Sequence, residues 1–284
     1  MIEIKHRETG QVLDSIDADT LQGADLRETR LAQADLSGQD LRDADLRRSD
    51  LRGADLHGAR LDRADLRGAN LSYADLREAN LENARLGADH RRDAADLHGC
   101  DMQAVNLSHA DLRRVRMCQC KLQGAQLQFA DLQGGDLSES DLSDARLLAG
   151  RMVDADMRRA KLPRADLRDS HLNGANLTEV DLSGADMSSR YDDGFSVLNR
   201  ASLRYANLQN TRMQGVWASD TDFCDADLRG ADLSHAVLSG ASMRHSRLDG
   251  TDFQGVELLT VNLGYANISQ AKNADVPPLK PNLR

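Results

Sequence analysis

The chain has 284 residues, of which 40% are hydrophobic, 29% charged and only 3% aromatic, and its formal net charge is −10. This acidic balance argues against direct nucleic-acid binding, which normally requires a basic patch. No apolar run approaches the roughly 18 residues of a membrane span, and the first ten residues lack the apolar core of a secretory signal. We therefore expect a cytoplasmic protein without membrane contact, whose four cysteines are reduced thiols.

The first predicted element in chain order is a β-hairpin within residues 1–18. It runs from Ile2 to Leu13, and Glu8, Thr9 and Gly10 form its turn. Exposed strand edges promote aggregation and are usually covered. We therefore expect this hairpin to cap the structure that follows it.

A five-residue repeat then fills residues 19–270. An apolar residue, large at every position but Ala218, stands at every fifth position from residue 21 to 86, from 97 to 187 and from 198 to 268, and 37 of these 48 positions hold Leu. In 46 of the 48 repeats a small residue stands two positions earlier. A helix needs apolar residues at i, i+3, i+4 and i+7, and a plain strand needs strict alternation, so neither explains this period.

The spacing within each repeat indicates how the chain is arranged. Residues two apart point to the same side of an extended segment, so the small residue and the leucine share one face. The polar residues that follow each leucine can turn the chain through a corner. Repetition of this unit predicts a stack of coils with a dry Leu and Ala interior and a mostly polar outside.

The segments ADLRGADL, ANLSYADL and GADLSHAVL resemble the pentapeptide-repeat proteins, and the resemblance covers roughly residues 19–270. It implies an all-β fold, a right-handed quadrilateral parallel β-helix with four pentapeptides in each 20-residue coil. The repeats would then form about 12 coils in one domain. Residues 271–284 would form a proline-containing C-terminal tail.

Two breaks interrupt the repeat, at residues 87–93 and 188–194. We expect each to add a single residue to its coil. They are either tolerated bulges or contact loops, because insertions in repeat proteins often map to a binding face. The candidate contact residues are His90, Arg91, Arg92, Arg190, Tyr191 and Asp192.

The outward position before each leucine supplies further candidate partner-binding residues. With one-residue shifts at the breaks, one face carries an acidic row and, later in the chain, an apolar stripe. The acidic row admits a purely structural alternative, because Asp side chains at corners hydrogen-bond the nearby backbone. The row consists of Asp35, Asp55, Asp75 and Asp96, and the stripe consists of Val197, Trp217 and Val237.

The stripe has two interpretations. An outward apolar strip that includes the only tryptophan is a candidate interface, either with a protein partner or between two copies in a homodimer. Alternatively, Trp217 packs locally, since Ala218 replaces a core leucine.

The sequence shows no catalytic constellation. The eight histidines are scattered, and no glycine-rich phosphate loop is present. Cys118 is expected to point outward, whereas Cys100 and Cys120 occupy inward positions on adjacent coils, which favours buried thiols. We expect a protein that is not an enzyme and that holds no metal or cofactor.

The resemblance also suggests a partner. Some pentapeptide-repeat proteins imitate duplex DNA, bind type II topoisomerases (DNA gyrase or topoisomerase IV) and confer antibiotic resistance by protecting them from poisons. An acidic rod of about 60 Å fits this role, because it matches about 18 base pairs. The net charge of −10 is, however, far below the ~36 phosphates of such a duplex. The alternative is a generic protein–protein interaction scaffold or effector module.

Overall fold

The computed structural model describes residues 1–189 and 196–275. The chain divides into two compact units, residues 1–146 and 147–284. The single repeat domain and its boundaries near residues 18 and 270 stay predictions.

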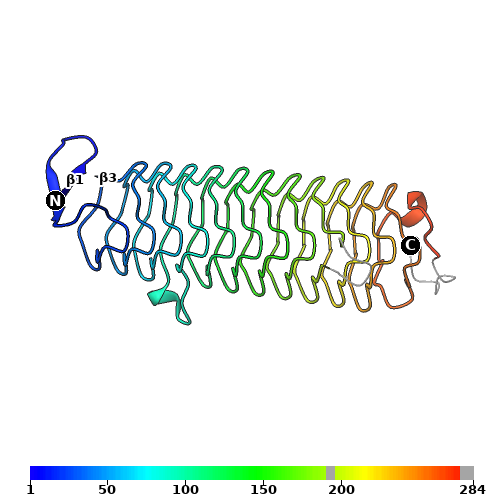
Figure 1. Cartoon of the computed structure of the whole chain (residues 1–284). Helices are drawn as coiled ribbons and strands as arrows, with labels where there is room; N and C mark the ends of the chain where they lie inside the picture. Colours follow the sequence, from blue (N-terminus) through cyan, green and yellow to red (C-terminus); the bar gives the residue numbers. More distant parts are fainter. Residues whose placement is uncertain (190–195, 276–284) are drawn as a thin grey trace. The chain divides into compact units, whose positions relative to one another are not determined.

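Both units are built from the same coil. Parallel β-bridges join residues 20 positions apart, as between Asp25 and Asp45, and further bridges begin at Arg30, Asp35 and Asp40. Each coil therefore has four paired sides (Figure 1). The leucine beside each bridge lies inside, and its backbone N–H donates to the next coil, as from Leu26 to the Asp45 carbonyl at 2.8 Å. This pairing confirms a quadrilateral parallel β-helix.

The corners use a left-handed backbone conformation. The second residue after a central leucine commonly has a positive φ, as at Tyr73 (φ 62°) and Gly68 (φ 71°). This conformation costs a residue with a Cβ roughly 1–2 kcal/mol. The corner N–H groups also bond to the next coil, as from Tyr73 to the carbonyl of His98 at 2.9 Å, and this bond offsets part of that cost.

The N-terminal hairpin covers one side of the first coil. Strand β1 (Ile2–His6) pairs antiparallel with β2 (Val12–Ile16) and, on its other edge, with β3 (Ala34–Asp35). The sheet order is β2-β1-β3. The hairpin thus occupies the strand edge that Ala34 and Asp35 would otherwise expose.

The first break differs from its prediction. Across it the bridges join residues 26 apart, Asn70 with Asp96 and Asp75 with Asp101, so six residues leave the coil instead of one. The backbone closes behind them, because the Ala95 N–H donates to the Leu86 carbonyl at 2.8 Å. The reason is chemical: retaining one more repeat would place Arg92 at the core position between Leu86 and Leu97. The excluded residues form a loop with the short 3-10 helix η1 (Arg91–Asp93) (Figure 1).

The second break also inserts more residues between bridged positions than predicted. His171 bridges Val197, again 26 residues apart. The candidate contact residues Arg190, Tyr191 and Asp192 lie outside the described residues.

The second unit contains a further 3-10 helix, η2 (Ile268–Gln270). Within residues 1–189 and 196–275, no helix has the length and apolar character needed to cross a membrane.

Candidate partner-binding surfaces

The predicted acidic row is correct for three residues and wrong for the fourth. Asp35, Asp55 and Asp75 stack on successive coils, but the next residue in this row is Asp101. Asp96 lies on a different side, between Asn70 and Arg116. The six-residue loop causes this shift, because it moves every later residue by one full pentapeptide.

The carboxylates of this row are engaged within the protein. Asp35 accepts a hydrogen bond from the Ser37 hydroxyl at 2.7 Å, and Asp55 accepts the backbone N–H of His57 at 3.0 Å. Asp75 forms an ion pair with Arg77 at 2.5 Å. Asp101 also has a cation beside it, with the Lys121 ammonium at 3.0 Å. These contacts agree with the structural interpretation of the row, and its role in partner binding stays a prediction.

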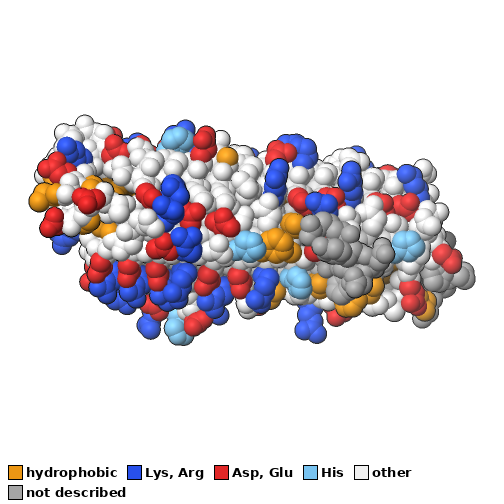
Figure 2. All heavy atoms as spheres, viewed as in Figure 1, with side chains coloured by type: hydrophobic (Ala, Val, Ile, Leu, Met, Phe, Trp, Pro, Cys, Tyr) orange, Lys and Arg blue, Asp and Glu red, His pale blue; other side chains and the backbone are white. Residues whose placement is uncertain are grey.

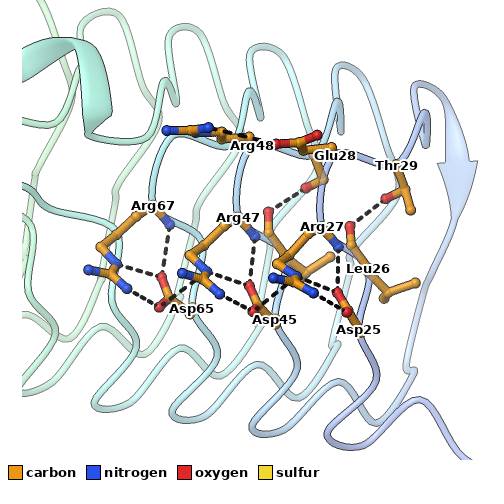
Figure 3. A network of polar contacts seen from close by, with 12 residues as sticks. Asp25, Leu26, Arg27, Glu28, Thr29, Asp45, Arg47, Arg48, Asp65 and Arg67 are labelled. Atoms are coloured by element: carbon orange, nitrogen blue, oxygen red, sulfur yellow. Dashed lines mark hydrogen bonds and ion pairs between the residues drawn. The ribbon is translucent and has the colours of Figure 1, made fainter.

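A second acidic series is combined with arginines. On the side that begins at Asp25, the carboxylates of Asp25, Asp45 and Asp65 each accept hydrogen bonds from the arginine two residues later (Figure 3). Side-chain and backbone hydrogen bonds from Arg27 lower the pKa of Asp25 from 3.8 to about 2. Burial raises the pKa of Asp65, but hydrogen bonds from Arg67 outweigh it and leave this pKa below its ordinary value.

The loop at the first break is tied back to its own unit. Arg91 forms an ion pair with Asp136 at 2.9 Å, and Asp89 forms one with Arg113 at 2.9 Å. Arg92 remains 84% exposed, and His90 is exposed as well. Of the predicted contact residues in this loop, Arg91 is therefore partly committed to holding the loop, whereas His90 and Arg92 face solvent.

The apolar stripe of the second unit is shorter than predicted. Val197, Trp217 and Val237 do share one side on successive coils. Trp217 and Val237 are 42% and 41% exposed, but Val197 is only 7% exposed. Val197 therefore occupies the outward bridge position, as predicted, but the prediction that it is exposed to solvent is wrong. Ala218 is fully buried at its core position.

Four exposed aromatic residues were not selected from the sequence. Together with Trp217 they make five of the seven aromatic residues in the described part of the chain, and their exposure lies between 42% and 66%. All four occupy positive-φ corners, two positions after a central leucine, and this position was the available sequence signal. They are Tyr73, Phe129, Tyr205 and Tyr265.

Nearby side chains contact three of these corner rings. Phe129 stacks on His109 and Tyr265 stacks on His245, each with ring centroids 4.9 Å apart. The Arg204 guanidinium lies 5.4 Å from the centre of the Tyr205 ring. These three rings keep their contacts while remaining 48%, 55% and 64% exposed at Phe129, Tyr205 and Tyr265.

The cysteines are free thiols. Cys100 and Cys120 are buried, as predicted, and burial raises the pKa of the Cys100 thiol, with its neighbour Cys120 adding to the shift. Cys118 is partly exposed, and its Sγ lies 3.1 Å from His98 Nδ1. Burial and the nearby Asp136 raise the pKa of Cys118, which is the opposite of an activated nucleophile. Among the described residues, no three His, Cys, Asp or Glu side chains group closely enough to hold a metal ion.

The family model for pentapeptide repeats matches residues 21–58, 49–87, 93–119, 120–159, 151–188 and 219–255, in eight copies. These segments cover more than half of the chain. The chain belongs to the pentapeptide-repeat family. The match agrees with the 20-residue pairing of the coils and confirms the family predicted from the sequence.

Solved pentapeptide-repeat structures give further comparisons. HetL, involved in heterocyst differentiation regulation in the cyanobacterium Nostoc, is 29% identical, with 87% of this chain and 91% of HetL covered and a TM-score of 0.26. QnrB1, a plasmid-mediated fluoroquinolone resistance protein, is 15% identical, with 78% and 88% covered and a TM-score of 0.28. These TM-scores are too low to support any argument about function. No curated protein matches the chain.

Proposed function

We propose that this pentapeptide-repeat chain is a non-enzymatic protein-binding β-helix that recognises its partner through outward side chains. The observation that carries the proposal is the placement of five of the seven described aromatic residues on the surface. Burying an aromatic side chain removes 150–250 Å² from water. Tyr and Trp also dominate the binding energy of protein interfaces. Exposed rings in a protein with so few aromatics are therefore best explained by contact with another protein.

A paired comparison of variants tests this proposal. The chain is immobilised as wild type, as the double variant Tyr205→Ala and Trp217→Ala, and as Asn210→Ala. Asn210 is a matched control, because it is exposed and occupies a positive-φ corner like Tyr205. We expect a discrete host protein to bind the wild type and the control and to be lost from the double variant. Equal retention by all three, or by none, would overturn the proposal.

A type II topoisomerase is the most concrete candidate partner. The first unit carries 28 acidic against 20 basic residues, whereas the second carries 18 against 16. The acidic excess therefore gathers in the unit that also contains the Asp35, Asp55, Asp75 and Asp101 row. Such a row supports an imitation of the DNA backbone. The cations beside Asp75 and Asp101 reduce the likeness.

Supercoiling by purified DNA gyrase tests this candidate. The protein is titrated with and without a fluoroquinolone, and we expect either rescue from the drug or inhibition of the bare enzyme. The effect should weaken steeply with added salt, because charge attraction is screened. The double variant Asp35→Asn and Asp55→Asn should weaken it as well. If the protein has no effect on supercoiling at tens of micromolar, a topoisomerase is excluded as the partner. The proposal of a different protein partner would still stand.

The thiols bear on where the protein acts. All four cysteines are free, and persistent free thiols suit a reducing compartment. We propose a cytoplasmic location on this ground. Homodimer formation stays a prediction, for which sedimentation of the purified chain is the direct test.

A further inference from the structure

One side of the first unit carries three identical ion pairs on successive coils. Arg27, Arg47 and Arg67 each bind the Asp two residues earlier through Nε and Nη2, at 2.5 to 2.8 Å (Figure 3). Other Asp-x-Arg pairs occur in the described coils, but in none is the pair repeated on the next coil. Figure 2 shows Lys and Arg side chains in a row beside Asp and Glu side chains along the lower left edge.

The three arginines line a single groove of about 500 Å³. The loop at the first break forms part of its wall through Ala88, Arg92 and Asp93. Five arginines and two acidic residues contribute to the lining. The complete lining is Arg27, Glu28, Arg47, Arg48, Arg67, Gly68, Ala88, Arg92 and Asp93.

The hydrogen bonds to Asp use Nε and Nη2 of each guanidinium, so Nη1 can donate to a ligand. Among the described residues, no hydrogen bond is found from Nη1 of Arg27, Arg47 or Arg67. The carboxylates fix the orientation of the guanidinium groups, so little side-chain entropy remains to be lost on binding. Successive coils are about 4.8 Å apart, so Arg27 and Arg67 lie about 10 Å apart along the stack.

We propose that this arginine groove binds an extended acidic segment of a partner protein. In an extended segment, alternate side chains point to one side about 6.7 Å apart, so two or three carboxylates can reach the three guanidinium groups. Arg48 and Arg92 are 71% and 84% exposed and can close over the segment from the rims. The acidic lining residues Glu28 and Asp93 lie 3.7 and 3.6 Å from these same rim arginines. The inference rests on the proposed function, because it specifies the chemistry of a partner.

A nucleic acid is a weaker occupant than an acidic peptide. The first unit has 28 acidic and 20 basic residues, so its overall field repels a long polyanion. A peptide with a few carboxylates experiences less of this repulsion and still makes the short-range contacts with the groove.

Fluorescence anisotropy with a labelled peptide of four Glu-Ala repeats tests the groove, because its four carboxylates alternate along the chain. Arg47→Gln is compared with Arg77→Gln, because Arg77 grips Asp75 in the same way on another side of the unit. Both substitutions remove one positive charge and release one carboxylate. We expect Arg47→Gln to weaken peptide binding about fivefold, the scale of one exposed charge contact, and Arg77→Gln to change it less than twofold. Thermal unfolding of both variants confirms that they fold.

Three outcomes would overturn the inference. They are equal losses in the two variants, no binding of the Glu-Ala peptide by the wild type at millimolar peptide, and tighter binding of an eight-nucleotide single-stranded DNA than of the peptide. None of them bears on the Tyr205 and Trp217 variants, which lie in the second unit. Failure of the groove is thus distinguishable from failure of the proposed protein-binding function.

Discussion

The Asp-x-Arg pair is the smallest unit that recurs on the surface. The Asp carboxylate bonds both the backbone N–H and the guanidinium of the arginine two residues later, so it holds the start of the corner and neutralises a charge at once. Of the two hydrogen bonds that Asp25 accepts from Arg27, the one from the guanidinium lowers the pKa of Asp25 more than the one from the backbone N–H does.

Replacing Arg27 by Gln should raise the pKa of Asp25 from about 2 towards its ordinary value of 3.8. Since the pKa is depressed in the folded state, the pair stabilises the protein above pH 3.8 and loses this effect as the pH falls towards 2. The NMR titration of the Asp25 carboxyl carbon measures the shift. An unchanged midpoint near 2 in the variant would show that the backbone alone lowers this pKa.

The core leucines carry the stability of each coil. Leu56 is fully buried, whereas Leu259 is 68% exposed. Leu56→Ala should lower the free energy of unfolding by about 2–5 kcal/mol through lost burial and a cavity. Leu259→Ala is the matched control and should change it by less than about 0.5 kcal/mol. Denaturant unfolding compares the two, and similar losses would contradict the assignment of Leu56 to the core.

At the scale of the element, the five-residue period determines which features of the coil can be predicted. It places leucines inside and polar residues at the corners, so the coil follows from the sequence. The register after the first break did not follow, because insertions of one and of six residues leave the same five-residue phase. Only the cost of burying Arg92 distinguishes them. The exposure of Val197 was wrongly predicted for a related reason, since the period cannot tell whether an outward position is covered.

Alanine substitutions at two corner glycines distinguish the cost of backbone strain from the cost of steric crowding. Gly99 and Gly124 have φ of +68° and +67°, but a Cβ on Gly99 would meet the Tyr73 ring at 2.7 Å, whereas Gly124 has open space. Gly124→Ala should cost about 1–2 kcal/mol through the left-handed φ alone. Gly99→Ala should cost about 0.5–1.5 kcal/mol more, because Tyr73 loses its contact with His98. In a Tyr73→Ala background the two substitutions should destabilise the protein equally. Thermal unfolding of the variants measures both costs, and a persistent difference would contradict the role of Tyr73.

At the scale of the whole molecule, the interior is nearly the same in every coil, so differences in function must lie outside. The family match and the repeated pairing establish the β-helix. The surface differs between the units, since the first carries most of the acidic excess and the arginine groove, and the second carries the exposed Trp217 and Val237. A binding protein with more than one contact surface is consistent with this division.

Photo-crosslinking in the host cell tests the protein-binding claim most directly. A benzophenone amino acid replaces Tyr205 in one variant and Asn210 in another, two exposed positive-φ corners of the same unit. After irradiation, we predict a discrete covalent adduct with one host protein from the Tyr205 position and none from the Asn210 position. No adduct at Tyr205, or the same adducts at both positions, would contradict recognition of a partner through the exposed aromatic corners.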